Sequence, residues 1–255
     1  MKSNISITAE FASLIKSESD PRNAYFVSSK TQKIHRILRW VLPKNFLNDI
    51  FVWRQHLSEK FDKKIAKEQP GQIIDLGAGY SLRGFNLCVK NSDLVYIDSD
   101  FNYVISRKKR IMDSLCEKEG IPFPKNLHFV AIDVLHDSIP VKVGNLLETG
   151  KETLIIAEGL ISYFSMPELQ SFFSQIQNTF TQFPLASFYS SEKFADPKGF
   201  LYKIVRKGLA FATQSQKSHQ FKDEESFIDF LKDCGITHYK REDFDSGRLM
   251  YSITV

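Results

Sequence analysis

The sequence predicts an α/β protein with a doubly wound, Rossmann-like sheet that is mostly parallel and ends in an antiparallel C-terminal strand. From about residue 73 onward, short runs rich in apolar and β-branched residues alternate with helical patterns. This alternation is typical of βαβ units. The runs IID, LVYI and LIIA are continuously apolar, as expected for parallel strands that are covered on both faces of a sheet.

The first segment, residues 1–68, lacks glycine and precedes the first predicted strand. Its stretches IHRILRWVL and FLNDIFVWRQHLSEKF place apolar residues three and four positions apart. That spacing puts the apolar side chains on one face of a helix. We therefore expect an N-terminal helical cap in front of the sheet.

The next segment, residues 69–195, is predicted to form the core of the fold. Its expected strands are GQIIDLG, DLVYIDSD, NLHFVAIDV, ETLIIAEGL and PLASFYSS. In the last segment, residues 221–255, the helix DEESFIDFLKDCGI is followed by two runs joined at Asp245-Ser246-Gly247. Because these three residues are a turn signal, we expect the two runs to pair as antiparallel strands.

An insertion at residues 196–220 separates the fifth strand from that helix and is predicted to be a lid. It is rich in lysine and arginine, and such runs are more often a solvated helix face than an anion-binding surface. At 255 residues, the chain is of a size that commonly forms one α/β domain, so we expect residues 1–255 to be a single domain.

Composition excludes several classes of protein. The net charge of +4 is too small to indicate a nucleic-acid binder. The three cysteines are far apart and lack CxxC spacing, which argues against a zinc site or a disulfide framework. The N-terminus lacks the apolar stretch of a signal peptide, and no window approaches a membrane span. We expect a cytoplasmic protein with no metal and no nucleic-acid or membrane partner.

The stretch IIDLGAGYS ends a predicted buried strand with Gly77, Ala78 and Gly79. Glycine at such a turn allows the backbone to approach a ligand closely, as in nucleotide-binding folds. A dinucleotide site would continue the pattern to GxGxxG, but this chain has Leu82 at the last position. The turn therefore predicts a nucleotide-like ligand without identifying it.

Acidic residues recur near the ends of successive predicted strands. Asp98 and Asp100 stand where carboxylates accept hydrogen bonds from ribose hydroxyls. Asp133 is predicted to accept from an adenine amine, with Val134 beside the ring, and Glu158 to face an ammonium group. Taken singly, each acid is more often a helix cap or a turn residue. Together they would repel a pyrophosphate and stabilise a ligand with an ammonium and a sulfonium, such as S-adenosylmethionine.

The motifs DLGAGYSLRGFNL, DFNYVISRKK, AIDV and AEGLISYF resemble those of class I methyltransferases, and specifically the leucine carboxyl methyltransferase family, which includes polyketide O-methyltransferases. The resemblance covers residues 73 to about 175. It implies that Arg54, in FVWRQHL, binds the cofactor carboxylate and that Lys16, in ASLIK, does similar work. Guanidinium and ammonium groups suit that contact. Where many relatives have Asp-Thr-Arg, this chain has Ser81-Leu82-Arg83.

The resemblance implies an S-adenosylmethionine-dependent O-methyltransferase that acts on a carboxylate or hydroxyl of a small molecule or peptide C-terminus. Tyr163, in EGLISYF, is the candidate residue at the acceptor site, and His219, in the predicted lid, is a candidate base. A carboxylate acceptor needs no base because it is ionised at neutral pH, whereas a phenol or alcohol does. Two alternatives remain: a cofactor-binding regulatory protein without turnover, and a nicotinamide-dependent oxidoreductase, which Leu82 disfavours.

Overall fold

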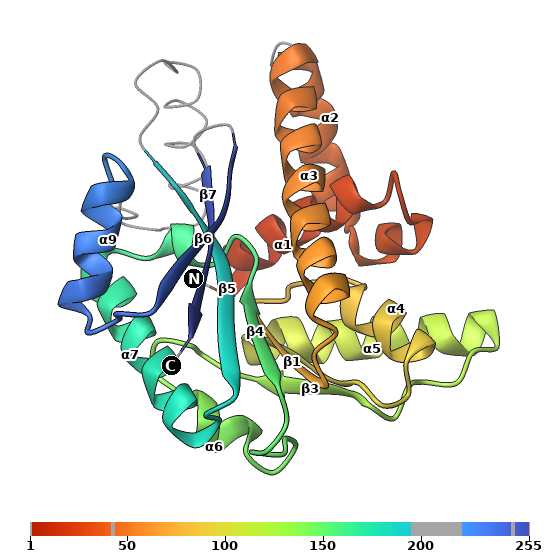
Figure 1. Ribbon diagram of the computed structural model, residues 1–255. Coiled ribbons are helices and arrows are strands. Elements are labelled where there is room, and N and C mark those ends of the chain that lie inside the picture. Colours follow the sequence, from red (N-terminus) through yellow and green to blue (C-terminus); the bar gives the residue numbers. More distant parts are fainter. Residues whose placement is uncertain (1, 42–43, 195–220, 246–247, 255) are drawn as a thin grey trace.

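The computed structural model describes residues 2–41, 44–194, 221–245 and 248–254, and Figure 1 shows a twisted sheet with helices on both faces. The lid predicted at residues 196–220 lies outside the described residues, and so does His219. In the described part of the chain, no helix is long and apolar enough to cross a bilayer. The described residues also contain no cluster of three or more metal-ligating side chains.

The sheet has seven strands in the order β3-β2-β1-β4-β5-β7-β6. All pairs among β1 to β5 are parallel, whereas β7 is antiparallel to both β5 and β6. This confirms the predicted fold class, including the antiparallel ending. The strands are β1 Gln72–Leu76, β2 Val95–Asp100, β3 Leu127–Ala131, β4 Thr153–Ala157, β5 Ala186–Lys193, β6 Tyr239–Asp245 and β7 Arg248–Thr254.

The chain reverses its direction of travel across the sheet between β1 and β4, which pair with each other at the centre. In open α/β sheets, ligands bind outside the carboxyl ends of the strands at such a switch point. Asp75, near the end of β1, pairs in register with Asp98 of β2 and with Ile156 of β4. The topology therefore predicts a ligand site at the end of β1.

Helices cover both faces of the sheet, and four helical segments precede β1 among the described residues. Figure 1 places α6, α7 and α9 on one side of the sheet and α3, α4 and α5 on the other. The helical segments are α1 Lys2–Lys16, η1 Pro21–Phe26, α2 Ser29–Val41, α3 Lys44–Glu68, α4 Arg83–Lys90, α5 Asn102–Glu119, α6 Ile139–Val143, η2 Ile161–Tyr163, α7 Met166–Gln182 and α9 Glu224–Asp233.

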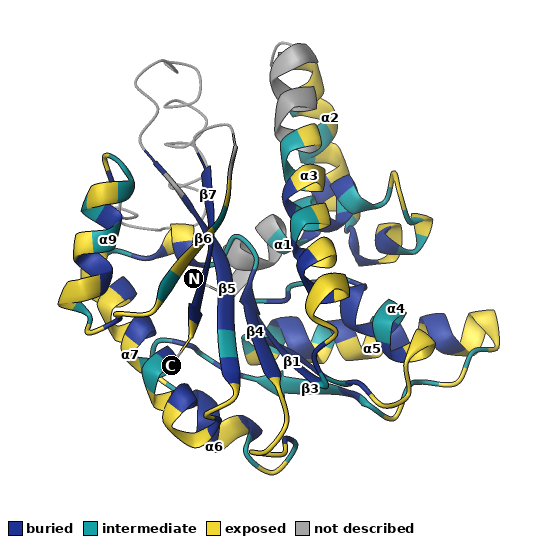
Figure 2. Cartoon of the chain, viewed as in Figure 1, coloured by how far each residue is buried: buried dark blue, intermediate teal, exposed yellow. Residues whose placement is uncertain are grey.

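Two apolar cores stabilise the sheet, one on each face, and Figure 2 shows their buried residues along the strands. The core beneath α7 and α9 is rich in phenylalanine, with Phe172, Phe173 and Phe188 fully buried. Their rings meet edge to face at centroid distances of 5.7 to 6.1 Å, the arrangement that aromatic quadrupoles favour. The central strands are thus buried on both faces, as the continuous apolar runs predicted.

The helix α7 begins at a capping box. Glu168 Oε2 accepts hydrogen bonds from the backbone N–H and the hydroxyl of Ser165, each at 2.7 Å. These contacts fix the first turn of α7.

Candidate functional site

The glycine turn after β1 forms the floor of a cavity at the carboxyl end of the sheet. Gly77 and Gly79 have φ angles of 68° and 53°, a region that residues with a Cβ rarely adopt. A Cβ at Gly77 would lie 3.0 Å from the Leu160 side chain. The cavity is bounded by α1, α3, the end of β1 and the β4–η2 connection, and its charged lining residues are Lys16, Arg54, Asp75, Arg83, Asp100 and Glu158.

The last part of α1 closes this cavity from above the glycine turn. Ala9 lies 3.4 Å from the place that a Cβ of Gly79 would occupy. The Ser13 hydroxyl donates a hydrogen bond to the Tyr80 carbonyl at 3.4 Å. The N-terminal helical segment therefore contributes directly to the site, including Lys16 in the last turn of α1.

Asp100 ends β2 and is held by the turn itself. Its Oδ2 accepts the Gly79 N–H at 2.9 Å, and its Oδ1 accepts the Phe101 N–H at 2.7 Å. Burial raises the pKa of Asp100, although these two backbone donors act in the opposite direction. The carboxylate lines the cavity beside Gly79, which fits its predicted contact with ribose hydroxyls.

Arg83, the first residue of α4, connects the acids of the cavity. Its Nη2 donates to Glu158 Oε2 at 2.5 Å, and its Nε donates to Asp62 Oδ1 at 2.6 Å. Its Nη1 lies 3.6 Å from Asp75 Oδ2. Its side chain is only 6% exposed, and its partners range from the buried Asp75 to the exposed Asp62, whose side chains are 1% and 58% exposed. The guanidinium thus compensates three carboxylates at once.

Glu158 and Lys16 form the second half of this charged cluster, with Nζ 3.5 Å from Oε1. Burial alone would raise the pKa of Glu158, but Lys16 and Arg83 outweigh it and lower that pKa to about 2. Burial lowers the pKa of Lys16, and Glu158 opposes that shift. Glu158 is consequently a carboxylate at neutral pH, as a contact for an ammonium group requires.

Asp75 is the most deeply placed acid that lines the cavity, with a side chain that is 1% exposed. The Tyr96 hydroxyl donates to its Oδ2 at 2.8 Å. Burial raises the pKa of Asp75 to about 6, against the lowering effect of Arg83. This carboxyl therefore titrates closer to neutral pH than an exposed aspartate does.

Arg54 and Tyr163 line the cavity from α3 and from η2. The Arg54 Nη1 lies 3.6 Å from the place of a Cβ on Gly159, and its positive charge helps to lower the pKa of Glu158. Tyr163 is 37% exposed, so it lies at the opening of the cavity and not within the apolar core.

Asp98 is not among the described residues that line the cavity, so its contact with the ribose stays a prediction. It lies inside β2 and forms an ion pair with Lys108 of α5, with Nζ 2.7 Å from Oδ2. Each of these side chains is 1% exposed. Burial raises the pKa of Asp98, and Lys108 opposes that shift. Asp98 therefore has a structural role, because Lys108 of α5 compensates its buried charge.

Asp133 and Val134 follow β3 and are not among the residues that line this cavity. Asp133 Oδ1 accepts the Leu135 N–H at 3.1 Å, and its Oδ2 lies 3.1 Å from His136 Nδ1. Val134 is buried in the phenylalanine-rich core. The structure thus shows a turn role for Asp133, and the adenine contact stays a prediction.

Arg83 and Asp75 are charged residues that line the cavity but that the sequence motifs did not indicate. One signal in the sequence points to Arg83. A cation in the first turn of a helix is disfavoured by the helix dipole, so an arginine that opens α4 directly after the glycine turn requires carboxylate partners. Asp62 and Glu158, from α3 and the end of β4, supply them.

The family model described as leucine carboxyl methyltransferase matches residues 10–177, well over half of the chain. No curated protein matches the chain in sequence. The matched segment begins in α1 and ends within α7, so it includes every charged residue that lines the cavity.

A solved structure shares this fold at low sequence identity. PigF with SAH has 12% identity and a TM-score of 0.51, with 74% of this chain and 51% of PigF covered. Human N-acetylserotonin methyltransferase in complex with SAM has 13% identity and a TM-score of 0.49, with 72% of this chain and 47% of that protein covered. The apo methyltransferase SibL has 12% identity and a TM-score of 0.49, with 80% of this chain and 57% of SibL covered. The chain thus spans about half the length of these proteins.

Proposed function

We propose that this chain, which belongs to the leucine carboxyl methyltransferase family, transfers a methyl group from S-adenosylmethionine to a carboxylate or hydroxyl oxygen. Its acceptor is a small molecule or a peptide C-terminus. The family is one of S-adenosylmethionine-dependent methyltransferases. The observation that carries the proposal is the charge pattern of the cavity, where cations and carboxylates face one another above the glycine turn.

The cavity lining fits an amino-acid head group. Lys16 and Arg54 provide positive charges for a carboxylate, and Glu158 provides a carboxylate for an ammonium. Because Gly77 and Gly79 have no side chains, a ligand can approach the backbone between these charged groups. A zwitterion replaces the present Lys16–Glu158 contact with two complementary ones, so no charge in the cavity would be left unpaired.

The cofactor supplies a methyl group that its sulfonium has already activated. The chain therefore has to bind it, exclude water and hold an oxygen nucleophile in line with the methyl, which is an effect of proximity and orientation. In the proposal, Asp100 holds the ribose and α1 covers the site. Tyr163 stands at the opening of the cavity, where it would contact the acceptor.

The first test compares two ligands on one variant. Arg54→Ala should weaken S-adenosylhomocysteine binding about tenfold or more, because a charge-assisted hydrogen bond contributes about 1.5–3 kcal/mol. Binding of 5′-methylthioadenosine, which lacks the carboxylate, should stay within about twofold in calorimetry. The Gln55→Ala variant, which changes an exposed neighbour on α3, is the matched control. Equal losses for both ligands would show that Arg54 does not bind the carboxylate.

A regulatory protein that binds the cofactor without turnover is the second candidate. The observation that favours it is the 2.5 Å contact between Arg83 and Glu158, which already occupies one oxygen of the acid. Transfer of a labelled methyl group to panels of carboxylates and phenols separates the two functions. Cofactor binding without transfer to any acceptor would favour the regulatory candidate.

A further inference from the structure

The helix α2 lies in a stretch of the chain that has no acidic residue. Residues 21–48 contain no aspartate or glutamate, although they contain six arginine and lysine residues. Within α2 a cation stands at every third position; these residues are Lys30, Lys33, Arg36 and Arg39. All four are exposed, and Figure 1 shows α2 at the outer edge of the molecule, away from the sheet. The helix therefore presents positive charge to its surroundings.

Two large apolar side chains lie among these cations. Trp40 is 88% exposed and Ile37 is 60% exposed. Positions 33, 36, 37 and 40 are three or four residues apart, so Trp40 and Ile37 share one face of the helix with two of the cations. Solvation explains a charged helix face, but not the free-energy cost of leaving a tryptophan and an isoleucine in water. We refer to six residues together as the α2 face; they are Lys30, Lys33, Arg36, Ile37, Arg39 and Trp40.

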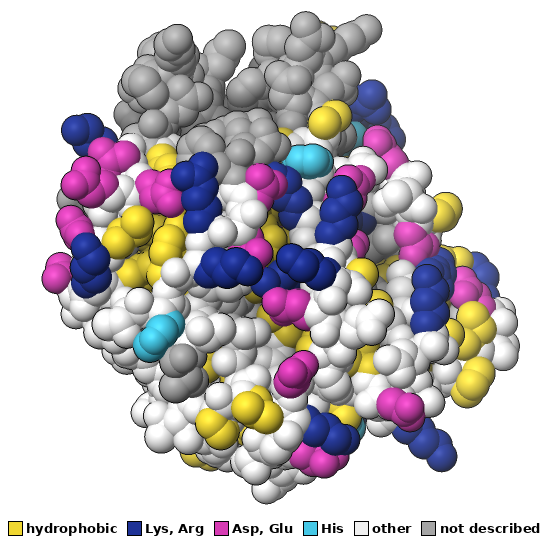
Figure 3. Space-filling model, in the orientation of Figure 1, with side chains coloured by type: hydrophobic (Ala, Val, Ile, Leu, Met, Phe, Trp, Pro, Cys, Tyr) yellow, Lys and Arg dark blue, Asp and Glu magenta, His cyan; other side chains and the backbone are white. Residues whose placement is uncertain are grey.

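The acids that approach α2 lie on its packed side. Glu10 accepts a hydrogen bond from the hydroxyl of Thr31 at 2.5 Å, and Thr31 is fully buried. Burial lowers the pKa of His35, Arg39 acts in the same direction, and Glu18 opposes both. In the described part of the chain, no carboxylate lies within ion-pair distance of any cation of the α2 face. On the face of the molecule seen in Figure 3, by contrast, basic and acidic side chains lie among one another.

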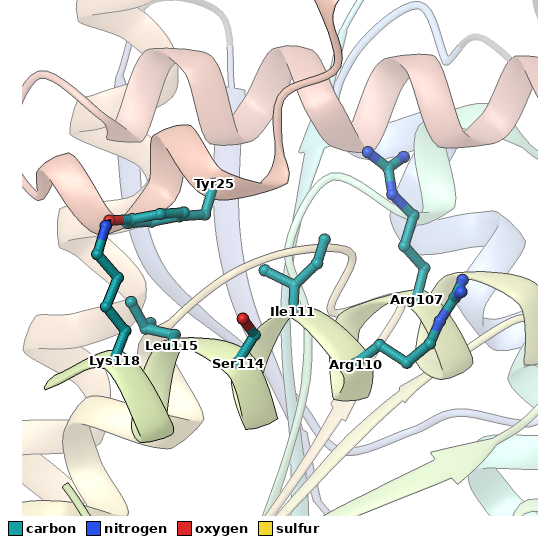
Figure 4. Close-up of a pocket in the computed structure, with 7 residues that line it drawn as sticks. All are labelled: Tyr25, Arg107, Arg110, Ile111, Ser114, Leu115 and Lys118. Atoms are coloured by element: carbon teal, nitrogen blue, oxygen red, sulfur yellow. The ribbon is translucent and has the colours of Figure 1, made fainter. Parts of the chain in front are cut away.

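Basic side chains of α5 show what a cation with a structural role looks like in this protein. Figure 4 shows Lys118 beside Tyr25, and Lys118 Nζ donates to the Tyr25 hydroxyl at 2.5 Å. Arg107 forms an ion pair with Glu10, and its Nη2 donates to the Phe26 carbonyl at 3.2 Å. These two cations hold η1 and α1 against α5. The cations of the α2 face make no comparable contact in the described chain.

We propose that the α2 face binds the surface of a bilayer that contains anionic phospholipids. The four cations attract the negative head groups, and a cluster of this size on a helix is typical of such binding. Trp40 and Ile37 enter the boundary between head groups and acyl chains, where an indole is favoured and an aliphatic side chain leaves water. The prediction of no membrane partner rested on the absence of a signal peptide and of a spanning window. A helix that lies on a bilayer needs neither.

Two other occupants fit the α2 face less well. In a symmetric pair of copies the same surface meets itself, so four cations would face four cations without a carboxylate between them. A nucleic acid would attract the cations and could stack a base on Trp40. A bilayer does both and also takes Ile37 out of water.

The experiment measures co-sedimentation of the full chain with vesicles, without any methyl donor, so its result is independent of the proposed methyl transfer. Phosphatidylcholine vesicles in which about one third of the lipid is phosphatidylglycerol should bind about tenfold or more tightly than pure phosphatidylcholine vesicles. Lys33→Gln with Arg36→Gln should weaken binding to the anionic vesicles about tenfold or more. The matched control, Lys109→Gln with Lys125→Gln, removes the same charge from exposed residues outside α2. It should stay within about threefold, because salt screens charges that do not touch the bilayer.

The apolar part of the α2 face is tested in the same way. Ile37→Ala with Trp40→Ala should weaken binding about tenfold or more, because two side chains no longer leave water. The matched control is Val89→Ala with Val141→Ala, which truncates two exposed apolar residues on α4 and α6. Its affinity should stay within about twofold.

Fluorescence shows which side of the protein meets the lipid, since the chain has two tryptophans. Trp53→Phe leaves Trp40 as the only one, and lipids with brominated acyl chains should quench its emission. Trp40→Phe leaves Trp53, which packs against the core and lies 4.4 Å from the guanidinium of Arg248. Its emission should not be quenched.

Several outcomes would overturn the proposal. They are an absence of binding to the anionic vesicles, equal binding to neutral vesicles, equal losses in a double variant and its control, and equal quenching of the two tryptophans. A single-stranded oligonucleotide and polyglutamate are measured beside the vesicles. If either bound as tightly as the anionic vesicles, the α2 face would serve a nucleic acid or an acidic protein instead. Circular dichroism of each variant verifies that the fold is retained.

Discussion

Asp98 and Asp100 lie two positions apart on β2, but the fold uses them differently. Asp98 is paired with Lys108, and both side chains are almost fully buried. Asp100 instead accepts two backbone N–H groups, from Gly79 and Phe101, and lines the cavity. The comparison shows that the position of an acid near a strand end does not determine its role. What decides it is whether a neighbouring element supplies a buried cation.

The same contrast separates two of the buried cationic side chains, Lys108 and Arg83. Lys108 has one carboxylate partner, Asp98, in an environment closed by the Phe129 ring, whose centre is 5.8 Å away. Arg83 shares its charge among Asp62, Asp75 and Glu158 at the edge of a cavity. A closed ion pair holds the fold together, whereas a shared and partly open cluster can exchange one of its contacts for a ligand.

The largest effect is expected when the closed pair is broken. Lys108→Met leaves Asp98 buried without a partner, and the free energy of unfolding should fall by about 3–5 kcal/mol in urea denaturation. Lys109→Met, on the exposed side of α5, should change stability by less than about 0.5 kcal/mol. Similar losses in the two variants would show that the buried pair does not hold the sheet and α5 together.

Within the open cluster, Glu158 should contribute acid sensitivity, which a comparison with a Glu158 variant isolates. The pKa of Glu158 is lowered from 4.5 to about 2, so its contribution to stability is complete well above pH 4.5 and is lost as the pH falls toward 2. By pH 3 about 2 kcal/mol of that contribution should be gone. Asp75 acts in the opposite direction, since its raised pKa favours the folded state below about pH 6.

Denaturation of the wild type and of Glu158→Gln between pH 6 and pH 3 measures the Glu158 contribution. The difference in stability between the two proteins should shrink by about 2 kcal/mol over this range. A difference that is independent of pH would mean that Glu158 is not stabilised as a carboxylate by Lys16 and Arg83.

The smallest effect concerns the cofactor and compares the two acids of β2 directly. Asp100→Asn should weaken S-adenosylhomocysteine binding by about 1 kcal/mol, or about fivefold, because one charged acceptor is lost. Asp98→Asn should leave the affinity of the folded protein within about twofold, since Asp98 is not among the described residues that line the cavity. If Asp98→Asn weakened binding more than Asp100→Asn, the assignment of the two acids would be reversed.

Much of the fold was predictable because it depends on local patterns. The apolar runs located the five parallel strands, and the turn signal before Arg248 located the antiparallel pair. The glycine turn was also predictable, since Gly77 and Gly79 have the positive φ angles that their sequence position indicated. The sequence motifs indicated five residues that all line one cavity; they are Lys16, Arg54, Asp100, Glu158 and Tyr163.

The partners of the buried charges were not predictable in the same way. Arg83 meets Asp62 across 21 residues and Glu158 across 75, and Lys108 meets Asp98 from the facing helix. No periodicity reports such contacts, because they depend on how α3, α4 and α5 pack on the sheet.

The sequence by itself determined the order of the elements, the parallel sheet and the glycine turn, because backbone preferences and apolar periodicity act over a few residues. The tertiary structure alone decided which carboxylates face the cavity and which are neutralised inside the fold. The physical reason is that a buried charge requires a partner within a few ångströms, and that partner comes from a distant part of the chain.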